Sequence, residues 1–439
     1  MSSKARGIKV GLLGLGVIGS RVAQELIERT SIITTQLGSS IEISAVLVRD
    51  LEKQRSVLGL SHLITASPGD IIDNPDIDVV VEVMGGEMPA LDFVTRAIDN
   101  GKHIVTANKE LISKHGSDLM LRANQNKVCI NFEASVGGGI PIIRPIMEDL
   151  RGNDLRAIRS IINGTTNYIL SQMTQRGIGL DQALSEAQDL GYAEPDPTND
   201  IEGIDSAYKL SILASLAFQT QVRDIDVYRE GISSLNPKDI RYAGQLGYRI
   251  KLMAIAKKEG DRIEARVHPA LIPESAPLAK VEGVFNAVEI EGDLVGRVLF
   301  HGQGAGPMPT SSAILGDILG IGRYIVGGLE LPHNLIPKSS LEIKGIDELI
   351  SRYYIRLTAL NEAGVLAQMS RILGDLNIGI ATVIQKESDM ELKTAEVVIT
   401  TYPALEKDIR QALRDIRELT VVKEIENALR IEDWEEDHN

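Results

Sequence analysis

The sequence has almost no cysteine and few aromatic side chains. Cys129 is the single cysteine among 439 residues, so a disulfide bond within the chain is excluded. Aromatic residues make up 4% of the chain, and its hydrophobic cores must therefore be built mainly from Ile, Leu, Val and Ala. Such sparing use of cysteine is typical of a reducing compartment, and we expect a cytoplasmic protein.

Long apolar runs and an excess of positive charge are also missing. No window approaches the roughly 18 uncharged apolar residues of a membrane-spanning helix, and the N-terminus has no apolar signal core. The formal net charge of -15 opposes binding to nucleic acid and to anionic membrane surfaces, and we expect neither as a partner. The length predicts about three domains, each able to bury its own core.

Strand and helix patterns alternate along the first 135 residues. Short apolar runs are separated by segments in which apolar residues recur with helical spacing. Parallel strands need helical connections of this kind, so the alternation predicts a Rossmann-type doubly wound parallel sheet of the α/β class. The predicted strands are 8–13, 41–50, 77–86, 102–109 and 127–135, and the predicted helices are 17–30, 89–101 and 110–126.

The rest of the chain divides into regions of different character. Strand and helix patterns are mixed over 136–301, which predicts a separate α+β domain. Residues 331–352 are polar, contain two prolines and are expected to form a linker. The pattern over 353–431 is β-α-β-β-α-β, a ferredoxin-like order, and 432–439 form an acidic tail.

Three glycines near the N-terminus, Gly14, Gly16 and Gly19, have the G-x-G-x-x-G spacing. They follow a predicted strand and open a predicted helix, which is the context that dinucleotide binding requires. The helix N-terminus then offers free N–H groups to a pyrophosphate. Arg49 ends the second predicted strand, where an arginine can pair with a 2′-phosphate, and this favours NADP. The simpler interpretation of Arg49 is an exposed loop cation.

The segment "GYAEPDPTNDIEGIDSAYKL", residues 191–210, gathers five carboxylates ahead of one lysine. Asp205 and Lys209 are four residues apart and share one face of a predicted helix. A surface ion pair is the ordinary explanation of this spacing. The flanking "SILASLAF", however, predicts a largely buried helix, and a buried lysine needs a partner and is easily deprotonated. Lys209 is therefore a candidate for proton transfer.

Six motifs in this order carry a family resemblance: "GLGVIG", "TANKELIS", "FEASVGGGIP", "INGTTNYIL", the 191–210 segment and "GQGAGPMPTSSAI". With them, residues 8–330 resemble homoserine dehydrogenases. From 353 onward, "LNEAGVLAQMSRILGDLNIGI" resembles an ACT regulatory domain. The resemblance implies interconversion of L-homoserine and L-aspartate 4-semialdehyde with NAD or NADP, in threonine, methionine and isoleucine biosynthesis.

The resemblance also implies roles for single residues. Lys209 would be the proton donor or acceptor, with Asp205 holding it. Glu194 would be the main carboxylate that binds the substrate ammonium group, and Asp200 a second one. Lys109 would contact both cofactor and substrate.

The cofactor-binding residues implied by the resemblance come from three parts of the sequence. Gly306 would open a helix that returns to the first domain, so the predicted NAD(P)-binding domain is 1–135 plus 302–330. The complete implied set is Gly14, Gly16, Val17, Ile18, Gly19, Arg49, Thr106, Lys109 and Gly306.

The glycine-dense segment "FEASVGGGIP" is a candidate cation site. Carbonyl oxygens at such a turn can bind a hard cation. The family binds a monovalent ion, typically sodium, through oxygens at the positions of Glu133, Val136, Gly138 and Ile140. A plain hinge between domains is the alternative interpretation.

Two other functions remain open from the sequence. An enzyme resembling aspartate-semialdehyde dehydrogenase needs a cysteine nucleophile, but Cys129 lies within a strand pattern, where a thiol is more often core filler. An amino-acid sensor with an inactive dehydrogenase body predicts loss of the acid and lysine residues, yet Glu194, Asp205 and Lys209 are present.

The C-terminal region departs from the ACT pattern in its loop. Asn361, Glu362 and Ala363 precede Gly364, where the family more often has D-x-P-G. This departure weakens the expectation that threonine binds there as an effector. The region is also expected to assemble a homodimer or homotetramer.

Overall fold

The computed structural model describes residues 7–53, 59–329, 341–389 and 391–434. The chain forms two compact units, each assembled from three stretches of sequence. The first unit comprises Met1–Ile158, Tyr208–Asp226 and Asn286–Ser340, and the second comprises Arg159–Ala207, Val227–Phe285 and Leu341–Asn439. Among the described residues, no helix combines the length and the apolar character that crossing a bilayer requires.

A six-stranded parallel sheet organises the first unit. Its strands run in the order β3-β2-β1-β4-β5-β6, which is the doubly wound order, and the Rossmann-type sheet is confirmed. The strands are β1 (Ile8–Leu13), β2 (Ile41–Leu47), β3 (Ile64–Thr65), β4 (Val79–Glu82), β5 (His103–Thr106) and β6 (Ile130–Asn131). The helices between them are α1 (Val17–Glu28), α2 (Thr30–Leu37), α3 (Gly69–Ile72), α4 (Ala90–Asp99) and α5 (Lys109–Gln125).

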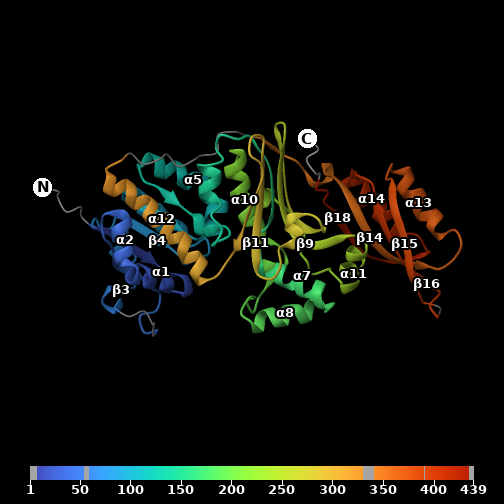
Figure 1. Cartoon of the computed structure of the whole chain (residues 1–439), viewed down its shortest axis with the longest axis horizontal. Coiled ribbons are helices and arrows are strands. Elements are labelled where there is room, and N and C mark those ends of the chain that lie inside the picture. Colours follow the sequence, from blue (N-terminus) through green and yellow to red (C-terminus); the bar gives the residue numbers. More distant parts are fainter. Residues whose placement is uncertain (1–6, 54–58, 330–340, 390, 435–439) are drawn as a thin grey trace. The chain divides into compact units, whose positions relative to one another are not determined.

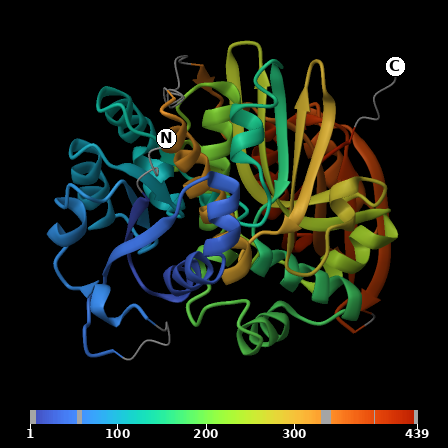
Figure 2. The ribbon, with the colours of Figure 1, turned by 60° about the vertical axis from the view of Figure 1, so that its left-hand side comes forward.

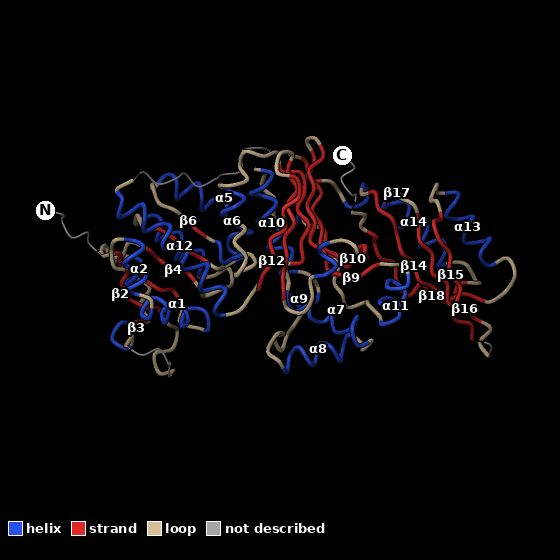
Figure 3. The backbone as a smooth tube through the Cα atoms, in the orientation of Figure 1, coloured by secondary structure: helices blue, strands red, loops and turns tan. Residues whose placement is uncertain are grey.

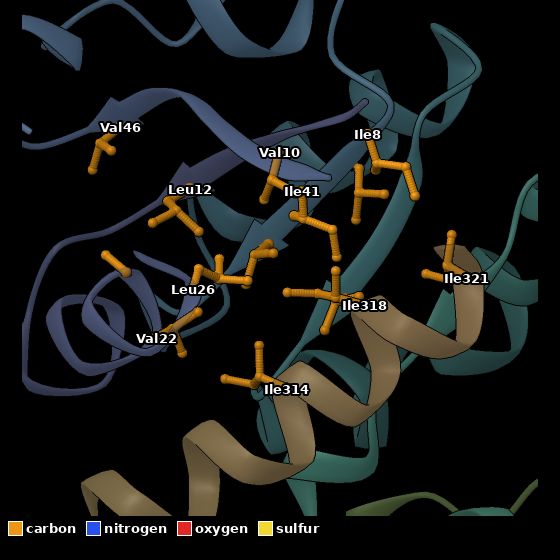
Figure 4. Close-up of a cluster of buried hydrophobic side chains, with 14 of the residues drawn as sticks. Ile8, Val10, Leu12, Val22, Leu26, Ile41, Val46, Ile314, Ile318 and Ile321 are labelled. Carbon is orange, nitrogen blue, oxygen red and sulfur yellow. The ribbon is translucent and has the colours of Figure 1, made fainter. Parts of the chain in front are cut away.

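A helix from far along the sequence completes the core of this sheet. α12 (Pro307–Gly327) lies beside α1 and α2 although nearly 300 residues separate them (Figures 1 and 2). Its Ile314, Ile318 and Ile321 are buried against β1 and α1 (Figure 4). They meet a cluster of aliphatic side chains that includes Ile8, Val10, Leu12, Val22 and Leu26. The core is aliphatic, as the low aromatic content requires.

The first unit also contains elements that come after the six-stranded sheet in the sequence. They are α6 (Ile143–Met147), the start of β7 (Leu155–Ile161), most of α10 (Ile204–Phe218), β11 (Phe285–Gly292) and β12 (Gly296–Gln303). The last two strands neighbour β7 in the order β12-β11-β7. Both β7 and α10 pass from one unit into the other.

In the second unit, helices precede a long hairpin. The helices are α7 (Gly164–Arg176), α8 (Leu180–Asp189), α9 (Thr198–Ile201) and α11 (Pro237–Gln245). β9 (Tyr248–Glu259) and β10 (Arg262–Pro273) pair antiparallel over their whole lengths. The short β8 (Tyr228–Arg229) and β13 (Glu342–Ile343) both pair with β10.

The C-terminal module, residues 350–431, has the predicted ferredoxin-like order. Its antiparallel sheet runs β18-β14-β16-β15, and α13 and α14 cover one face (Figures 1 and 3). The elements are β14 (Ile350–Leu360), α13 (Val365–Asp375), β15 (Ile380–Asp389), β16 (Thr394–Thr401), β17 (Ala404–Leu405), α14 (Glu406–Arg417) and β18 (Val422–Ile431).

Alternate residues of β14 face different surroundings. Tyr353, Ile355 and Leu357 join the apolar core under α13 and α14. Arg356, on the opposite face, is fully buried and donates to the Asp239 carboxylate of α11. The sheet is therefore covered on both faces, by apolar packing on one and by ion pairs on the other.

The structure differs from the sequence prediction in three places. Residues 30–37, expected to be connection, form α2, and the predicted strand over 127–135 is only Ile130–Asn131. The predicted linker 331–352 begins outside the described residues, and 341–352 contain β13, a 3₁₀ turn and the start of β14. Residues 435–439 of the predicted tail also lie outside them. The three-domain division stays a prediction.

Candidate active site

The glycine turn between β1 and α1 has the geometry of a phosphate cradle. Gly14 adopts φ +111°, which side chains disfavour. A Cβ at Gly19 would lie 2.2 Å from the Gly14 carbonyl oxygen, so this position must be glycine for the helix to approach the strand. Gly16 precedes α1 with no side-chain cap and with open space around it. The first N–H groups of α1 are thus left for an anion, and the residues present fit a dinucleotide.

Three other predicted cofactor-binding residues lie at the start of α1 and just after β2. Val17 is 74% exposed at the first position of α1, whereas Ile18 is partly buried. The Gly14 N–H donates to the Leu47 carbonyl at 3.1 Å, which places the turn beside the end of β2. Arg49 follows that end by two residues and is exposed. It therefore lies near the glycine turn.

A buried carboxylate that the sequence analysis missed forms hydrogen bonds at the ends of β4 and β5. Glu82, the last residue of β4, is fully buried and accepts a hydrogen bond from the Thr106 hydroxyl at 2.6 Å. It also accepts from the N–H groups of Met84 and Gly85. Burial raises the pKa of Glu82, and these hydrogen bonds offset part of that rise. The sequence signal that could have revealed Glu82 was an acid inside the apolar run "VVVEV".

Thr106 links Glu82 by hydrogen bonds to the residues at the start of α5, where Lys109 lies. The Thr106 hydroxyl accepts from the Asn108 N–H at 3.0 Å, and Asn108 caps α5 by accepting from the Leu111 N–H. Lys109 is the first residue of α5 and is partly buried. It follows β5 at the carboxyl edge of the sheet, where doubly wound folds bind their ligands.

In the second unit, one amide holds two of the predicted carboxylates. The Asn163 side-chain nitrogen donates to Asp200 Oδ1 at 2.6 Å and to Asp205 Oδ2 at 2.9 Å. Its oxygen accepts from the Thr166 N–H and hydroxyl, which fixes the orientation of the amide. Asn163 also caps α7 and is 4% exposed. The sequence showed Asn163 in a motif but did not indicate this role.

Asp205 and Lys209 lie within the first two turns of α10 and are 3% and 8% exposed. Burial of the lysine agrees with the apolar sequence around it and excludes a solvated surface pair. Glu194 is exposed on the loop before α9. Its neighbour Asp196 is also exposed and accepts from the Thr198 N–H and hydroxyl.

The glycine-dense segment after β6 is buried around Glu133, Val136, Gly138 and Ile140. Both Glu133 carboxylate oxygens are used to accept from the N–H groups at the start of α6, those of Ile142, Ile143 and Arg144. The Glu133 carboxylate is therefore engaged at the start of α6. In the described part of the chain, no three His, Cys, Asp or Glu side chains gather as a metal site.

Two further sequence candidates are placed by the structure. Gly306 precedes α12 in the first unit with φ +120° and no side-chain cap, but Pro307 and Pro309 have no N–H, so Met308 carries the one N–H group among the first three residues of this helix. Cys129 is buried, and burial raises the pKa of its thiol to about 11. A thiol protonated at neutral pH is a poor nucleophile, which argues against the cysteine-dependent enzyme.

Two family models match the first three quarters of the chain, and known relatives match almost all of it. The sequence model described as homoserine dehydrogenase matches residues 141–319, and that of the homoserine dehydrogenase NAD-binding domain matches 14–133. A homoserine dehydrogenase of Neisseria gonorrhoeae is 43% identical over 430 residues, covering 97% of this chain and 98% of the relative. The chain belongs to the homoserine dehydrogenase family. A homoserine dehydrogenase of Bacillus subtilis is 37% identical, covering 97% and 99%.

Solved structures of homoserine dehydrogenases have the same fold as this chain. That from Thiobacillus denitrificans superposes with a TM-score of 0.92 at 42% identity, covering 98% of this chain and 99% of that one. A hyperthermophilic archaeal homoserine dehydrogenase in complex with NADPH gives a TM-score of 0.63 at 26% identity, covering 75% and 99%. The chain is thus an oxidoreductase of the homoserine dehydrogenase family that uses a nicotinamide cofactor.

Removal of the Asn163 amide tests the geometry of the two carboxylates. We expect Asn163→Ala to lower kcat/KM for homoserine by about tenfold or more, because Asp200 and Asp205 lose the shared donor that orients them and offsets their repulsion. Steady-state kinetics measures this loss. Asn236→Ala is the matched control, because Asn236 caps α11 in the same unit but its side-chain oxygen accepts only at that cap in the contacts described. Equal losses in both variants would contradict the role of Asn163.

Proposed function

We propose that Lys209 transfers the proton and that the 194–205 segment binds the amino group of homoserine. The observation that carries this proposal is the Asn163 amide, which fixes Asp200 and Asp205 at the start of the helix that bears the buried Lys209. Oxidation of the alcohol releases a hydride and a proton, and the nicotinamide takes the hydride when it is bound. The proton leaves the hydroxyl for the Lys209 amine, and the reverse reaction returns it.

The carboxylates supply specificity. Homoserine carries an ammonium group that a simple alcohol lacks, and the side chains of Glu194 and Asp200 can pair with it. Glu194 is exposed on its loop, whereas Asp200 is oriented by Asn163. Asp205 positions Lys209 from one turn earlier on α10. Lys109, oriented through Thr106 and Asn108, contacts cofactor and substrate in this proposal.

The cofactor is held by the glycine turn, with NADP preferred. Gly14, Gly16, Val17, Ile18 and Gly19 present the N–H groups of α1 to the pyrophosphate. Thr106, Lys109 and Gly306 complete the set. Arg49, exposed beyond the end of β2, supports binding of a 2′-phosphate. The archaeal relative described in complex with NADPH is consistent with this preference.

A sodium ion is proposed at the carbonyl oxygens of Glu133, Val136, Gly138 and Ile140. Burial of this segment and use of the Glu133 carboxylate at α6 support a structural role. Threonine binding to the C-terminal module, assembly of a homodimer or homotetramer, and location in the cytoplasm stay predictions. The inactive sensor and the cysteine enzyme give way to the family assignment.

Replacement of Lys209 tests the proposed proton transfer. We expect Lys209→Met to lower kcat by about a hundredfold or more, because no other group takes over the proton. Lys209→Arg should be equally inactive, since a guanidinium does not lose its proton. Lys251→Met, which removes another buried lysine, should keep kcat. Full activity of Lys209→Met by absorbance at 340 nm would refute the role.

Replacement of Arg49 tests the cofactor preference. We expect Arg49→Ser to raise KM for NADP about tenfold and to leave KM for NAD unchanged, because only NADP carries the phosphate that the guanidinium binds. Lys53→Ser removes an exposed cation of the same segment and should change neither KM. The proposal fails if Arg49→Ser affects both cofactors alike.

Removal of sodium tests the cation site. With sodium chloride replaced by choline chloride at equal ionic strength, we expect a lower thermal midpoint that recovers in a saturable manner as sodium returns. Thermal denaturation followed by circular dichroism measures this shift. Identical midpoints in the two salts would show that no sodium is bound.

A further inference from the structure

A buried arginine of the C-terminal module lies between two carboxylates from different parts of the chain. Arg430 on β18 is 2% exposed and donates to Glu406 of α14 at 2.6 and 3.1 Å. It also donates to both carboxylate oxygens of Glu230, at 2.9 and 3.1 Å. Glu230 lies outside the module, directly after β8. The guanidinium therefore joins the module to the segment that follows β8.

Neighbouring side chains strengthen this junction. The Tyr228 hydroxyl donates to Glu230 and accepts from Arg410 of α14. The Arg430 guanidinium lies 5.2 Å from the Tyr228 ring centroid and 5.6 Å from that of Tyr353, at cation–π distance. We call Tyr228, Glu230, Tyr353, Glu406, Arg410 and Arg430 the Arg430 cluster; its members line a cavity of about 320 Å³.

The charge of Glu230 is held by this cluster. Burial raises the pKa of Glu230, but the Arg430 guanidinium together with the Tyr228 hydroxyl and His268 holds the pKa below its usual value. Glu230 is therefore ionised at neutral pH and remains paired. Its main chain is held as well, because the Glu230 N–H donates to the Val267 carbonyl of β10 at 2.8 Å.

The residues after Glu230 contact the α9–α10 corner, defined here as residues 200–205. The Ile232 N–H donates to the Ile201 carbonyl at 2.9 Å. A Cβ at Gly231 would lie 2.6 Å from the same carbonyl oxygen and 2.8 Å from the Glu202 Cα. The two backbones are thus in direct contact, with no space for a side chain between them. Asp200 and Asp205 lie at the two ends of this corner.

We propose that Glu230 is a positioning residue through which the Arg430 cluster fixes the α9–α10 corner, and with it Asp200, which binds the amino group of the substrate, and Asp205. The proposal rests on the proposed substrate role of the 194–205 segment. Glu230 is anchored on one side by Arg430, and one residue later the chain contacts Ile201 and Glu202. A shift of Glu230 is therefore passed on to the corner by main-chain contact, because the closely packed backbones cannot absorb it.

Two variants test the proposal by kinetics. Glu230→Ala removes the ion pair with Arg430, and Gly231→Ala keeps the pair but forces the two backbones apart. For each we expect KM for homoserine to rise by about fivefold or more, with KM for the nicotinamide cofactor changed by less than about twofold. Glu230→Gln, which keeps an oxygen that can accept from Arg430, should restore part of the loss. Gly231→Ala decides the question if Glu230→Ala does not fold.

Asp239→Ala is the matched control. Asp239 likewise holds a buried arginine of the C-terminal module, Arg356, but its carboxylate belongs to α11. If Asp239→Ala raises KM for homoserine as much as Glu230→Ala does, the effect is general loosening and the proposal is overturned. It is also overturned if both Glu230→Ala and Gly231→Ala leave this KM unchanged.

Glu194→Gln separates this proposal from the proposed function. If Glu194→Gln leaves KM for homoserine unchanged, the substrate role of Glu194 fails, whereas a selective KM effect of the Glu230 and Gly231 variants still supports control of the corner. If Glu194→Gln raises KM and the Glu230 and Gly231 variants do not, only the positioning role of Glu230 is lost.

Discussion

The candidate site depends on one side-chain amide. Asn163 caps α7, binds Asp200 at the end of α9 and binds Asp205 at the start of α10, so a single group joins the ends of three helices. Two carboxylates brought this close repel each other and lose hydration, and each needs a donor in return. Because Thr166 fixes the amide orientation, its two N–H groups are directed at the two acids. The geometry of the acidic segment is therefore set from the neighbouring helix.

Features encoded by neighbouring residues were predicted well from the sequence. The glycine turn, its strand and its helix are contiguous, and the glycine spacing in this context indicated the type of ligand, while the alternation of strands and helices indicated the fold. Burial of the α10 helix also followed from local composition, which removed the surface-pair explanation of Lys209. In the C-terminal module, strand and helix periodicities are regular, and the ferredoxin-like order was predicted from them.

Features that arise between distant residues were not predictable in this way. The two acids bound by Asn163 lie 37 and 42 positions along the chain, and Arg430 meets Glu230 across 200 positions. The periodicity of apolar residues in the sequence gives no information about such distant pairs. Glu82 was missed because an acid in an apolar strand gives no sign of its partner Thr106. Helix α2 was missed because "TSIITTQL" is rich in β-branched residues, which favour strands, although Ile33 and Leu37 are buried one turn apart.

The pairing of β10 with β18 has a consequence for shortened forms of the chain. Ala270 and Leu271 of β10 pair with Arg430 and Ile431, so the module continues the hairpin sheet by its final strand. A chain ending before the module would leave Ala270 and Leu271 at that edge of β10 unpaired and open to edge-to-edge contacts, whereas β8 and β13 would still cover the rest of the edge. It would also remove Glu432, which accepts from the buried Arg266 at 2.7 Å, and leave Glu264 as the remaining carboxylate bound to this guanidinium. Removal of the module would therefore change both the end of a sheet edge and the charge balance around Arg266.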